Sequence, residues 1–172
     1  LAPDEADRRL EGLRDRLAVA AVNAPRSTVL SGDREALELL LAELATDGVP
    51  WRWLPVDYAF HSPQMKALGD ELTDLLRGLE CSSLAATLVS TTTGRRVSSG
   101  DLSAAHWGEN VRGAVRFAPA VEVILGEGCD VFLELAPHPV LSAAGAATAE
   151  ARGAEVMVLA SLRRGKDERA TM

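Results

Sequence analysis

The sequence predicts an α/β fold in two parts, one over residues 3–56 and one over residues 57–160. Three observations support this expectation. Helical and strand patterns follow the order α-β-β-α-β up to residue 56, strands alternate with helices after residue 57, and apolar residues make up 47% of the 172-residue chain. The first order is that of a split βαβ unit without its first strand. Alternating strands and helices are typical of a parallel sheet covered by helices.

Local signals define each element of the first part. In order, we expect a helix over 3–16, strands over 17–22 and 27–31, a helix over 33–47 and a strand over 51–56. Pro3 suits the first turn of a helix, and leucines follow it at helical spacing. Asp33 is the expected N-cap of the second helix, and Gly48 ends that helix. Alternation of residue type predicts the strand over 51–56.

The second part predicts strands that alternate with helices. In order, we expect a helix over 62–79, strands over 86–92 and 95–97, helices over 104–111 and 117–125, a strand over 131–135, a helix over 139–149 and a strand over 156–159. The apolar run Val131–Leu135 is typical of a parallel strand that is buried on both faces. Because four strands do not complete a doubly wound sheet, we expect further sequence before Leu1.

Composition excludes several classes of function. The net charge of −7 disfavours nucleic-acid binding, which requires a positive field. The apolar runs are too short to span a bilayer, and the first residues lack the apolar segment of a signal peptide. Cys81 and Cys129 form neither a metal-ligand cluster nor a disulfide framework. We therefore expect a cytoplasmic protein with no metal, no membrane contact and no nucleic-acid partner.

His61 is the strongest candidate for chemistry. It lies where a loop enters a helix between the two parts, and open α/β folds bind ligands at such switch points. A histidine there can act as a general base; the alternative is that it caps or packs at a helix start. No Gly-x-Ser-x-Gly nucleophile motif is present, and we expect Ser62 to cap the helix. His106 is expected at the surface. His138 follows a buried strand, in a loop that either borders a site or forms a structural turn.

Five segments occur together in a characteristic order. They are AAVNAPRSTVLSGD from residue 20, PVDYAFHSPQM from residue 55, WGENVR from residue 107, VRF from residue 115 and FLELAPHPVL from residue 132. Together they resemble the C-terminal half of the acyltransferase domain of type I polyketide synthases, the enzymes of much antibiotic biosynthesis. The resemblance covers nearly the whole chain.

The resemblance implies a fold. Members of this family have an α/β-hydrolase-like large subdomain with a ferredoxin-like small subdomain inserted into it. Residues 3–56 would be the ferredoxin-like small subdomain with its first strand missing, and residues 57–160 the C-terminal part of the large subdomain. Residues 161–172 would begin the linker that follows the domain.

The resemblance also implies a reaction without a bound cofactor. These domains transfer a malonyl or related group from coenzyme A to a serine, and then to the phosphopantetheine thiol of an acyl carrier protein. By the match, His61 is the general base, and the main-chain carbonyl of Asn110 accepts a hydrogen bond from its imidazole. The serine belongs to the N-terminal half of the same domain, before Leu1. We therefore expect the isolated chain to be inactive.

The residues before His61 bear on the choice of substrate. In this family, His-Ala-Phe-His accompanies malonyl and Tyr-Ala-Ser-His accompanies methylmalonyl, whereas this chain has Tyr58-Ala-Phe60-His61. The large ring of Phe60 should exclude a branch methyl, so we expect malonyl-CoA as substrate. Tyr58 is the weaker clue. The alternative is that Phe60 packs between the subdomains and leaves the selection to other residues.

The acyl carrier protein is the other expected partner. Carrier proteins in these systems are acidic, so basic side chains are candidate contacts. These are Arg95, Arg96, Arg112, Arg116, Arg163, Arg164 and Arg169. An alternative function is a non-catalytic ferredoxin-like module that docks the carrier protein or neighbouring synthase domains. The intact context of His61 favours the enzyme, because a docking module needs no base.

Overall fold

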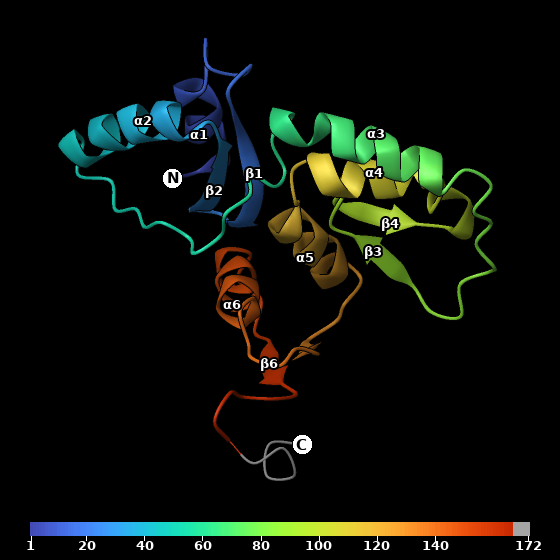
Figure 1. The fold of residues 1–172 in the computed structure, drawn as a ribbon. Helices are drawn as coiled ribbons and strands as arrows, with labels where there is room; N and C mark the ends of the chain where they lie inside the picture. The colour runs from blue at the N-terminus through green and yellow to red at the C-terminus, as the bar shows by residue number, and fades with distance from the viewer. Residues whose placement is uncertain (167–172) are drawn as a thin grey trace.

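The computed structural model describes residues 1–166, which form two α/β regions (Figure 1). The helices are α1 (Pro3–Arg9), α2 (Arg34–Thr46), α3 (Lys66–Leu75), α4 (Ala104–Arg112), α5 (Phe117–Gly126) and α6 (Ser142–Ala151), with 3-10 turns at Pro63–Met65 and Ser99–Asp101. The strands are β1 (Leu17–Ala24), β2 (Ser27–Gly32), β3 (Leu88–Ser90), β4 (Arg95–Val97), β5 (Val131–Glu134) and β6 (Met157–Ala160).

A small apolar core organises the N-terminal region. β1 and β2 form an antiparallel hairpin, and Leu10, the C-cap residue of α1, packs with Leu17 and with leucines of α2. The carboxylate of Asp33 accepts a hydrogen bond from the N–H of Ala36 at 3.0 Å and so caps α2, as the sequence predicts. The first helix ends earlier than expected. Gly12 has a φ of 82°, a left-handed conformation that a helix cannot continue through.

The predicted strand over 51–56 is wrong. These residues form neither helix nor strand and are exposed. Their alternating pattern is compatible with a sheet, but a strand also needs a neighbour for its N–H and C=O groups. Within residues 1–166, β1 and β2 form a two-stranded sheet, and residues 51–56 pair with neither strand. The observed order of this region is therefore α-β-β-α.

The second region contains a parallel pair and a hairpin. β5 and β6 pair in parallel and are connected through α6, as expected for a βαβ unit. β3 and β4 pair with each other in an antiparallel hairpin, so the predicted single parallel layer of four strands is wrong. The turn between them contains Gly94, whose φ is 67°. A tight turn of this kind reverses the chain and makes the pairing antiparallel.

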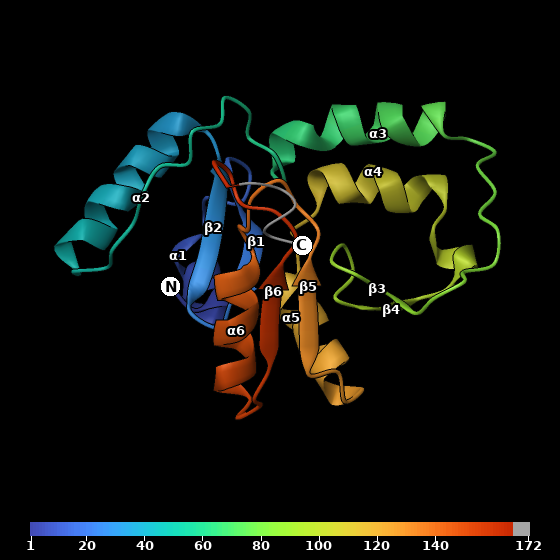
Figure 2. The same cartoon turned by 90° about the horizontal axis from the view of Figure 1, so that it is seen from below.

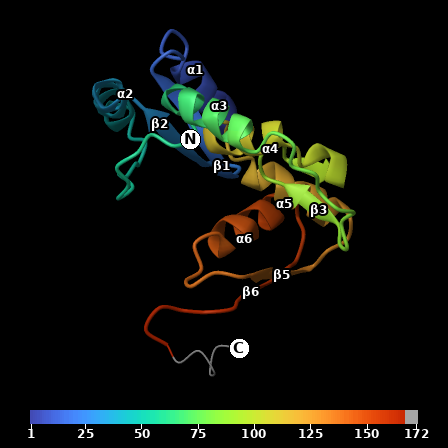
Figure 3. The ribbon, with the colours of Figure 1, turned by 45° about the vertical axis from the view of Figure 1, so that its right-hand side comes forward.

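The parallel pair is covered on one face. α5 and α6 lie on one side of β5 and β6 (Figure 3). Val131 and Leu133 on β5 are 55% and 56% exposed, and the residues that pair with them on β6 are Met157 and Leu159, at 58% and 46%. The expectation that Val131–Leu135 is buried on both faces is therefore wrong for the described residues. The opposite face carries an apolar surface open to solvent.

Backbone pairing joins the two regions. Val115, which follows α4, accepts a hydrogen bond from the N–H of Val22 and donates one to the carbonyl of Ala20, each at 2.8 Å. Its neighbour Arg116 donates to the carbonyl of Thr91 at 2.6 Å. The segment 113–116 therefore runs between β1 and the turn after β3. Seen from below, α5 and α6 lie beside β1 (Figure 2).

Candidate active site

His61 has an unusual backbone conformation at the centre of the molecule. It follows the exposed loop 51–60 and precedes the turn that begins α3, and its φ is 58°. Non-glycine residues in the left-handed region are uncommon and cost about 1–3 kcal/mol, so surrounding contacts must hold them. The N–H of His61 donates to the carbonyl of Val111 at 3.3 Å. Such outliers are often found at functional sites.

Ser62 stabilises this turn from inside. Its side chain is buried, with 2% exposure of the residue. The hydroxyl donates to the carbonyl of Ala59 at 2.6 Å and accepts from the N–H of Gln64. Ser62 therefore caps the turn before α3, as the sequence predicts, and its hydroxyl is occupied by backbone partners.

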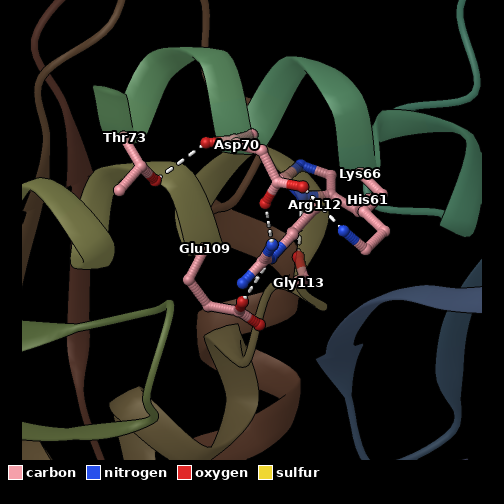
Figure 4. Close-up of polar contacts among 8 residues, drawn as sticks. His61, Lys66, Asp70, Thr73, Glu109, Arg112 and Gly113 are labelled. Atoms are coloured by element: carbon pink, nitrogen blue, oxygen red, sulfur yellow. Dashed lines mark hydrogen bonds and ion pairs between the residues drawn. The ribbon is translucent and has the colours of Figure 1, made fainter. Parts of the chain in front are cut away.

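One hydrogen bond fixes the imidazole of His61. Its Nδ1 lies 2.8 Å from the carbonyl oxygen of Gly113, at the end of α4 (Figure 4). Because a carbonyl oxygen can only accept, Nδ1 carries a proton, and in the neutral imidazole Nε2 then has a free lone pair. This is the tautomer that a general base requires, with the carbonyl in the place that a carboxylate takes in a serine-histidine-aspartate triad.

The carbonyl that holds His61 belongs to Gly113 and not to Asn110, so this sequence-based assignment is wrong. Asn110 lies inside α4, where carbonyls point along the helix axis, and its amide donates to the hydroxyl of Thr92 at 2.9 Å. Gly113 is the C-cap of α4 and is extended, with φ −80° and ψ 158°. Its carbonyl therefore turns away from the helix axis toward His61. A glycine two residues after the predicted helix over 104–111 is the sequence signal for this role.

Ion pairs connect α3 to α4 beside this hydrogen bond. Arg112 lies 2.7 Å from the carboxylate of Asp70 on α3 and 2.8 Å from that of Glu109 on its own helix (Figure 4). Asp70 also accepts from the ammonium of Lys66 at 2.6 Å. The hydrogen bond from Lys66 and the charges of Lys66 and Arg112 outweigh partial desolvation and lower the pKa of Asp70. Asp70 therefore remains a carboxylate that bridges two cations.

Two glycines let these helices approach closely. A Cβ at Gly108 would lie 2.0 Å from the Thr73 hydroxyl and 2.6 Å from the carbonyl oxygen of Gly69. A Cβ at Gly69 would lie 2.8 Å from the carbonyl oxygen of Gly108. The Thr73 hydroxyl donates to the carbonyl of Gly69 at 2.8 Å. The distance between α3 and α4 is therefore set by backbone-to-backbone contact.

Aromatic rings line the approach to His61. The ring centroids of Tyr58 and Phe60 are 5.8 Å apart, and those of Phe60 and His61 are 6.5 Å apart. Phe60 is 46% exposed and Tyr58 is 69% exposed. Phe60 therefore lies at the surface next to the candidate base, where it can contact a bound molecule.

Glu134 organises the loop between β5 and α6. Its carboxylate accepts from the N–H groups of Val140, Leu141 and Ser142 and from the Ser142 hydroxyl, at distances from 2.6 to 3.3 Å. Desolvation raises the pKa of Glu134, but these hydrogen bonds outweigh it and lower the pKa to about 2. His138, in the same loop, is exposed. Glu134 therefore has a structural role as the anchor of the α6 N-terminus.

Most of the other candidate residues form ion pairs or hydrogen bonds with other side chains or lie exposed at the surface. Arg95 and Arg96 lie 3.8 Å from Asp101 and 3.7 Å from Glu127, respectively. Arg116, Arg163 and Arg164 are exposed, whereas Arg169 lies outside the described residues. His106 Nε2 lies 3.4 Å from the Ser90 hydroxyl, away from His61. Cys81 donates to the carbonyl of Leu102, and Cys129 is exposed.

Within residues 1–166, no cluster of three or more histidine, cysteine, aspartate or glutamate side chains could hold a metal ion. No helix there combines the length and the apolar character that crossing a bilayer requires.

The sequence from residue 2 to residue 172 matches the family model described as the acyl transferase domain. The chain belongs to the acyltransferase domain family. Its relatives include polyketide synthase GfsE of Streptomyces halstedii, which is 40% identical over 166 residues. Another is the spectinabilin polyketide synthase system protein NorA' of Streptomyces orinoci, which is 42% identical over 160 residues. The expected resemblance to polyketide synthase acyltransferases is confirmed.

A solved structure confirms the α/β fold of this acyltransferase chain. The acyltransferase domain from module 8 of the salinomycin polyketide synthase superposes with a TM-score of 0.94 at 39% sequence identity. The match covers 99% of this chain and 40% of the solved chain. The two synthase alignments span 96% and 93% of this chain, but only 4% of each synthase. It therefore corresponds to part of one domain in its relatives.

Proposed function

We propose that this chain supplies the general base of a polyketide synthase acyltransferase domain. The domain would transfer a malonyl unit from coenzyme A, through a serine ester, to the phosphopantetheine thiol of an acyl carrier protein. The observation that carries this proposal is the hydrogen bond from His61 Nδ1 to the carbonyl of Gly113, which leaves Nε2 free. The serine would come from the N-terminal half of the same domain.

Proton transfer at Nε2 would serve both halves of the reaction. In the first half, Nε2 takes the proton from the serine hydroxyl as its oxygen attacks the thioester carbonyl, and returns the proton to the departing thiolate of coenzyme A. In the second half, Nε2 takes the proton from the pantetheine thiol and returns it to the serine oxygen. The Gly113 carbonyl stabilises the imidazolium in each half and holds the ring in place. General base catalysis of this kind contributes about 10²–10⁴-fold.

The position of Phe60 supports malonyl as the substrate. Its ring lies beside the imidazole, where the reacting thioester must approach, and is exposed enough to contact it. An added methyl on the malonyl α-carbon would meet this ring. Steric exclusion of that kind discriminates between substrates more strongly than the loss of one apolar contact, which is worth about 1–3 kcal/mol.

The open face of β5 and β6 supports the proposed partner within the domain. Sheets of parallel strands are normally covered on both faces. We propose that the N-terminal half of the domain covers the face that carries Val131 and Leu133, completes the large subdomain over residues 57–160 and brings the serine to His61. Residues 3–56 would then be the small subdomain, and residues 161–172 the start of a linker. Without the serine, the isolated chain would form no acyl-enzyme.

Replacing His61 in a complete domain that contains this chain tests the proposed function. Incubation with malonyl-CoA should add one malonyl mass to the protein, measured by intact mass spectrometry after quenching. We expect His61→Ala to lower the rate of this addition by about 10³-fold. His138→Ala is the matched control, since His138 is exposed in a loop, and should keep the rate. A His61→Ala domain with the unchanged rate would show that His61 is not the general base.

A change at Phe60 tests the choice of substrate. We expect Phe60→Ser, in the same complete domain, to raise acylation by methylmalonyl-CoA relative to malonyl-CoA by about 10-fold, because the ring no longer fills the space beside the α-carbon. The assay is competition between the two thioesters, with the acyl masses resolved on the protein. An unchanged product ratio would refute the steric account of Phe60.

A further inference from the structure

We propose that Asp70 and Arg112, together with the contact between Gly69 and Gly108, position the general base by holding the end of α4 against α3. This inference rests on the proposed role of His61. None of these four residues is proposed to touch the substrate. They would act through the Gly113 carbonyl, which determines the orientation of the imidazole.

Gly113 lies between two segments of chain that are held in place in different ways. After Gly113, the chain is held by main-chain hydrogen bonds, since Val115 pairs with Ala20 and Val22 on β1. Before Gly113, the chain is the last turn of α4, and its carbonyl at Val111 accepts from the N–H of His61. His61 itself leads into α3. The placement of the base therefore depends on how α3 and α4 lie against each other.

Side chains determine this placement at the end nearest to His61. Arg112, the residue before Gly113, spans from α4 to Asp70 on α3 at 2.7 Å. Asp70 lies one turn after Lys66, the first residue of α3, and therefore near His61 along the chain. The guanidinium and the carboxylate are 37% and 50% exposed, so the pair contributes little to global stability. The effect of the ion pair is local, because it fixes Arg112, the residue next to Gly113, whose carbonyl holds the imidazole.

The glycine contact sets the distance between the same helices. Gly69 precedes Asp70 and Gly108 precedes Glu109, so the closest backbone approach lies directly beside the ion pair. The Cβ of an alanine at Gly108 would overlap Thr73 and the backbone of Gly69. Helix α4 would have to move away, and the carbonyls of Val111 and Gly113 would move with it. A shift of about 1 Å in a catalytic group can cost about 100-fold in rate.

Four variants of a complete domain that contains this chain test the proposal. Asp70→Asn and Arg112→Met remove the pair between the helices. Asp74→Asn and Arg77→Met are matched controls, because Asp74 near the end of α3 and Arg77 just after that helix form an exposed ion pair of 2.6 Å that does not reach α4. We expect the first two variants to lower the acylation rate constant about 10-fold, with the KM for malonyl-CoA within about 2-fold. The controls should keep both values.

A double variant tests whether Asp70 and Arg112 act as one unit. If they do, the Asp70→Asn, Arg112→Met protein should lose no more rate than either single variant, because the second change removes an interaction that is already lost. Losses that multiply would show two independent effects and would overturn the proposed pair.

Nitrogen NMR of histidine gives a readout that a loss of stability would not change. In the unaltered domain, the His61 signals should show one neutral tautomer, with the proton on Nδ1; His61→Ala identifies these signals. In Asp70→Asn and Arg112→Met, we expect a mixture of the two neutral tautomers, since the imidazole is released from Gly113. Gly108→Ala should show the same mixture and a larger loss of rate. Gly145→Ala on α6, where a Cβ meets nothing within 4 Å, is its control.

The outcomes separate failure of this proposal from failure of the proposed function. If His61→Ala keeps the acylation rate, the role of His61 as base is wrong. If His61→Ala is inactive but Asp70→Asn and Arg112→Met keep the rate, the positioning role is wrong. The positioning role is also overturned if these variants lose rate while His61 keeps its single tautomer. If Gly108→Ala fails to fold, Asp70→Asn and Arg112→Met still decide the question.

Discussion

Glutamine in place of Glu134 should release the N-terminus of α6 from β5. One carboxylate oxygen accepts hydrogen bonds from the N–H groups of Val140 and Leu141. The other accepts from the N–H of Leu141 and from the N–H and hydroxyl of Ser142. Glutamine keeps one accepting oxygen. In place of the second oxygen it has an NH₂ group, whose N–H groups face donors and cannot accept from them. Two hydrogen bonds to a charged group are then lost, at about 1.5–3 kcal/mol each. Water replaces part of this loss, and we expect about 3 kcal/mol of destabilisation, or a Tm lower by about 6–12 °C.

The effect of this substitution should depend on pH. The pKa of Glu134 is lowered from 4.5 to about 2 in the folded protein. A carboxylate whose pKa is lowered by folding stabilises the protein fully above its unfolded value, and this stabilisation is lost as pH falls through the folded value. The difference in unfolding free energy between the parent protein and Glu134→Gln should therefore be constant above pH 5. It should shrink progressively between pH 4.5 and pH 2.

Thermal unfolding followed by circular dichroism at pH 7, 4 and 2 measures this difference. Hydrogen exchange at the amides of Val140, Leu141 and Ser142 gives the local readout and should be faster in Glu134→Gln. Glu150→Gln is the matched control, because Glu150 is exposed on α6 and its replacement should change stability by less than about 0.5 kcal/mol. A Glu134→Gln effect below 1 kcal/mol at pH 7, or one that is equal at pH 7 and pH 2, would refute the reasoning.

Three other substitutions have defined expectations. Leu40→Ala opens a cavity in the N-terminal core, where Leu40 is 2% exposed, and should cost about 2–5 kcal/mol in denaturant unfolding. Gly32→Ala, at a φ of 144° and with its Cβ 2.1 Å from the carbonyl oxygen of Arg16, should destabilise the hairpin by more than about 1 kcal/mol. Ser62→Ala removes the buried contacts of the turn that holds His61, so acylation by a complete domain should fall while binding of malonyl-CoA persists.

Local signals explain which parts of the fold could be predicted. The helix capped by Asp33 and the hairpin after Leu17 follow from residues close together in sequence, and the structure contains both. The strand expected over 51–56 depends on a partner that the alternation itself does not specify. By contrast, β3 and β4 are joined only by residues 91–94, which are too few for the crossover that a parallel pair requires, so their spacing itself predicts a hairpin.

The candidate site shows a similar division. A side chain such as His61 is visible in the sequence, and its place before a helix indicates a functional position. The group that orients it is a main-chain carbonyl, which every residue has, so the sequence indicates its neighbourhood and not its identity. The motif around Asn110 is close, but only the extended C-cap at Gly113 shows which carbonyl turns toward the imidazole. The contact of Gly69 with Gly108 depends on packing between helices and is equally invisible in the sequence.

The segment 113–116 should tolerate side-chain substitution during evolution. Its hydrogen bonds to β1 and to Thr91 join main-chain atoms on both sides, and its contact with the imidazole of His61 uses the main-chain carbonyl of Gly113. Main-chain contacts survive the exchange of side chains, except for proline at a donor position. Ala114 and Val115 can therefore vary in size and polarity while the base keeps its orientation. The orientation of the imidazole is in this way independent of the side chains that this segment carries.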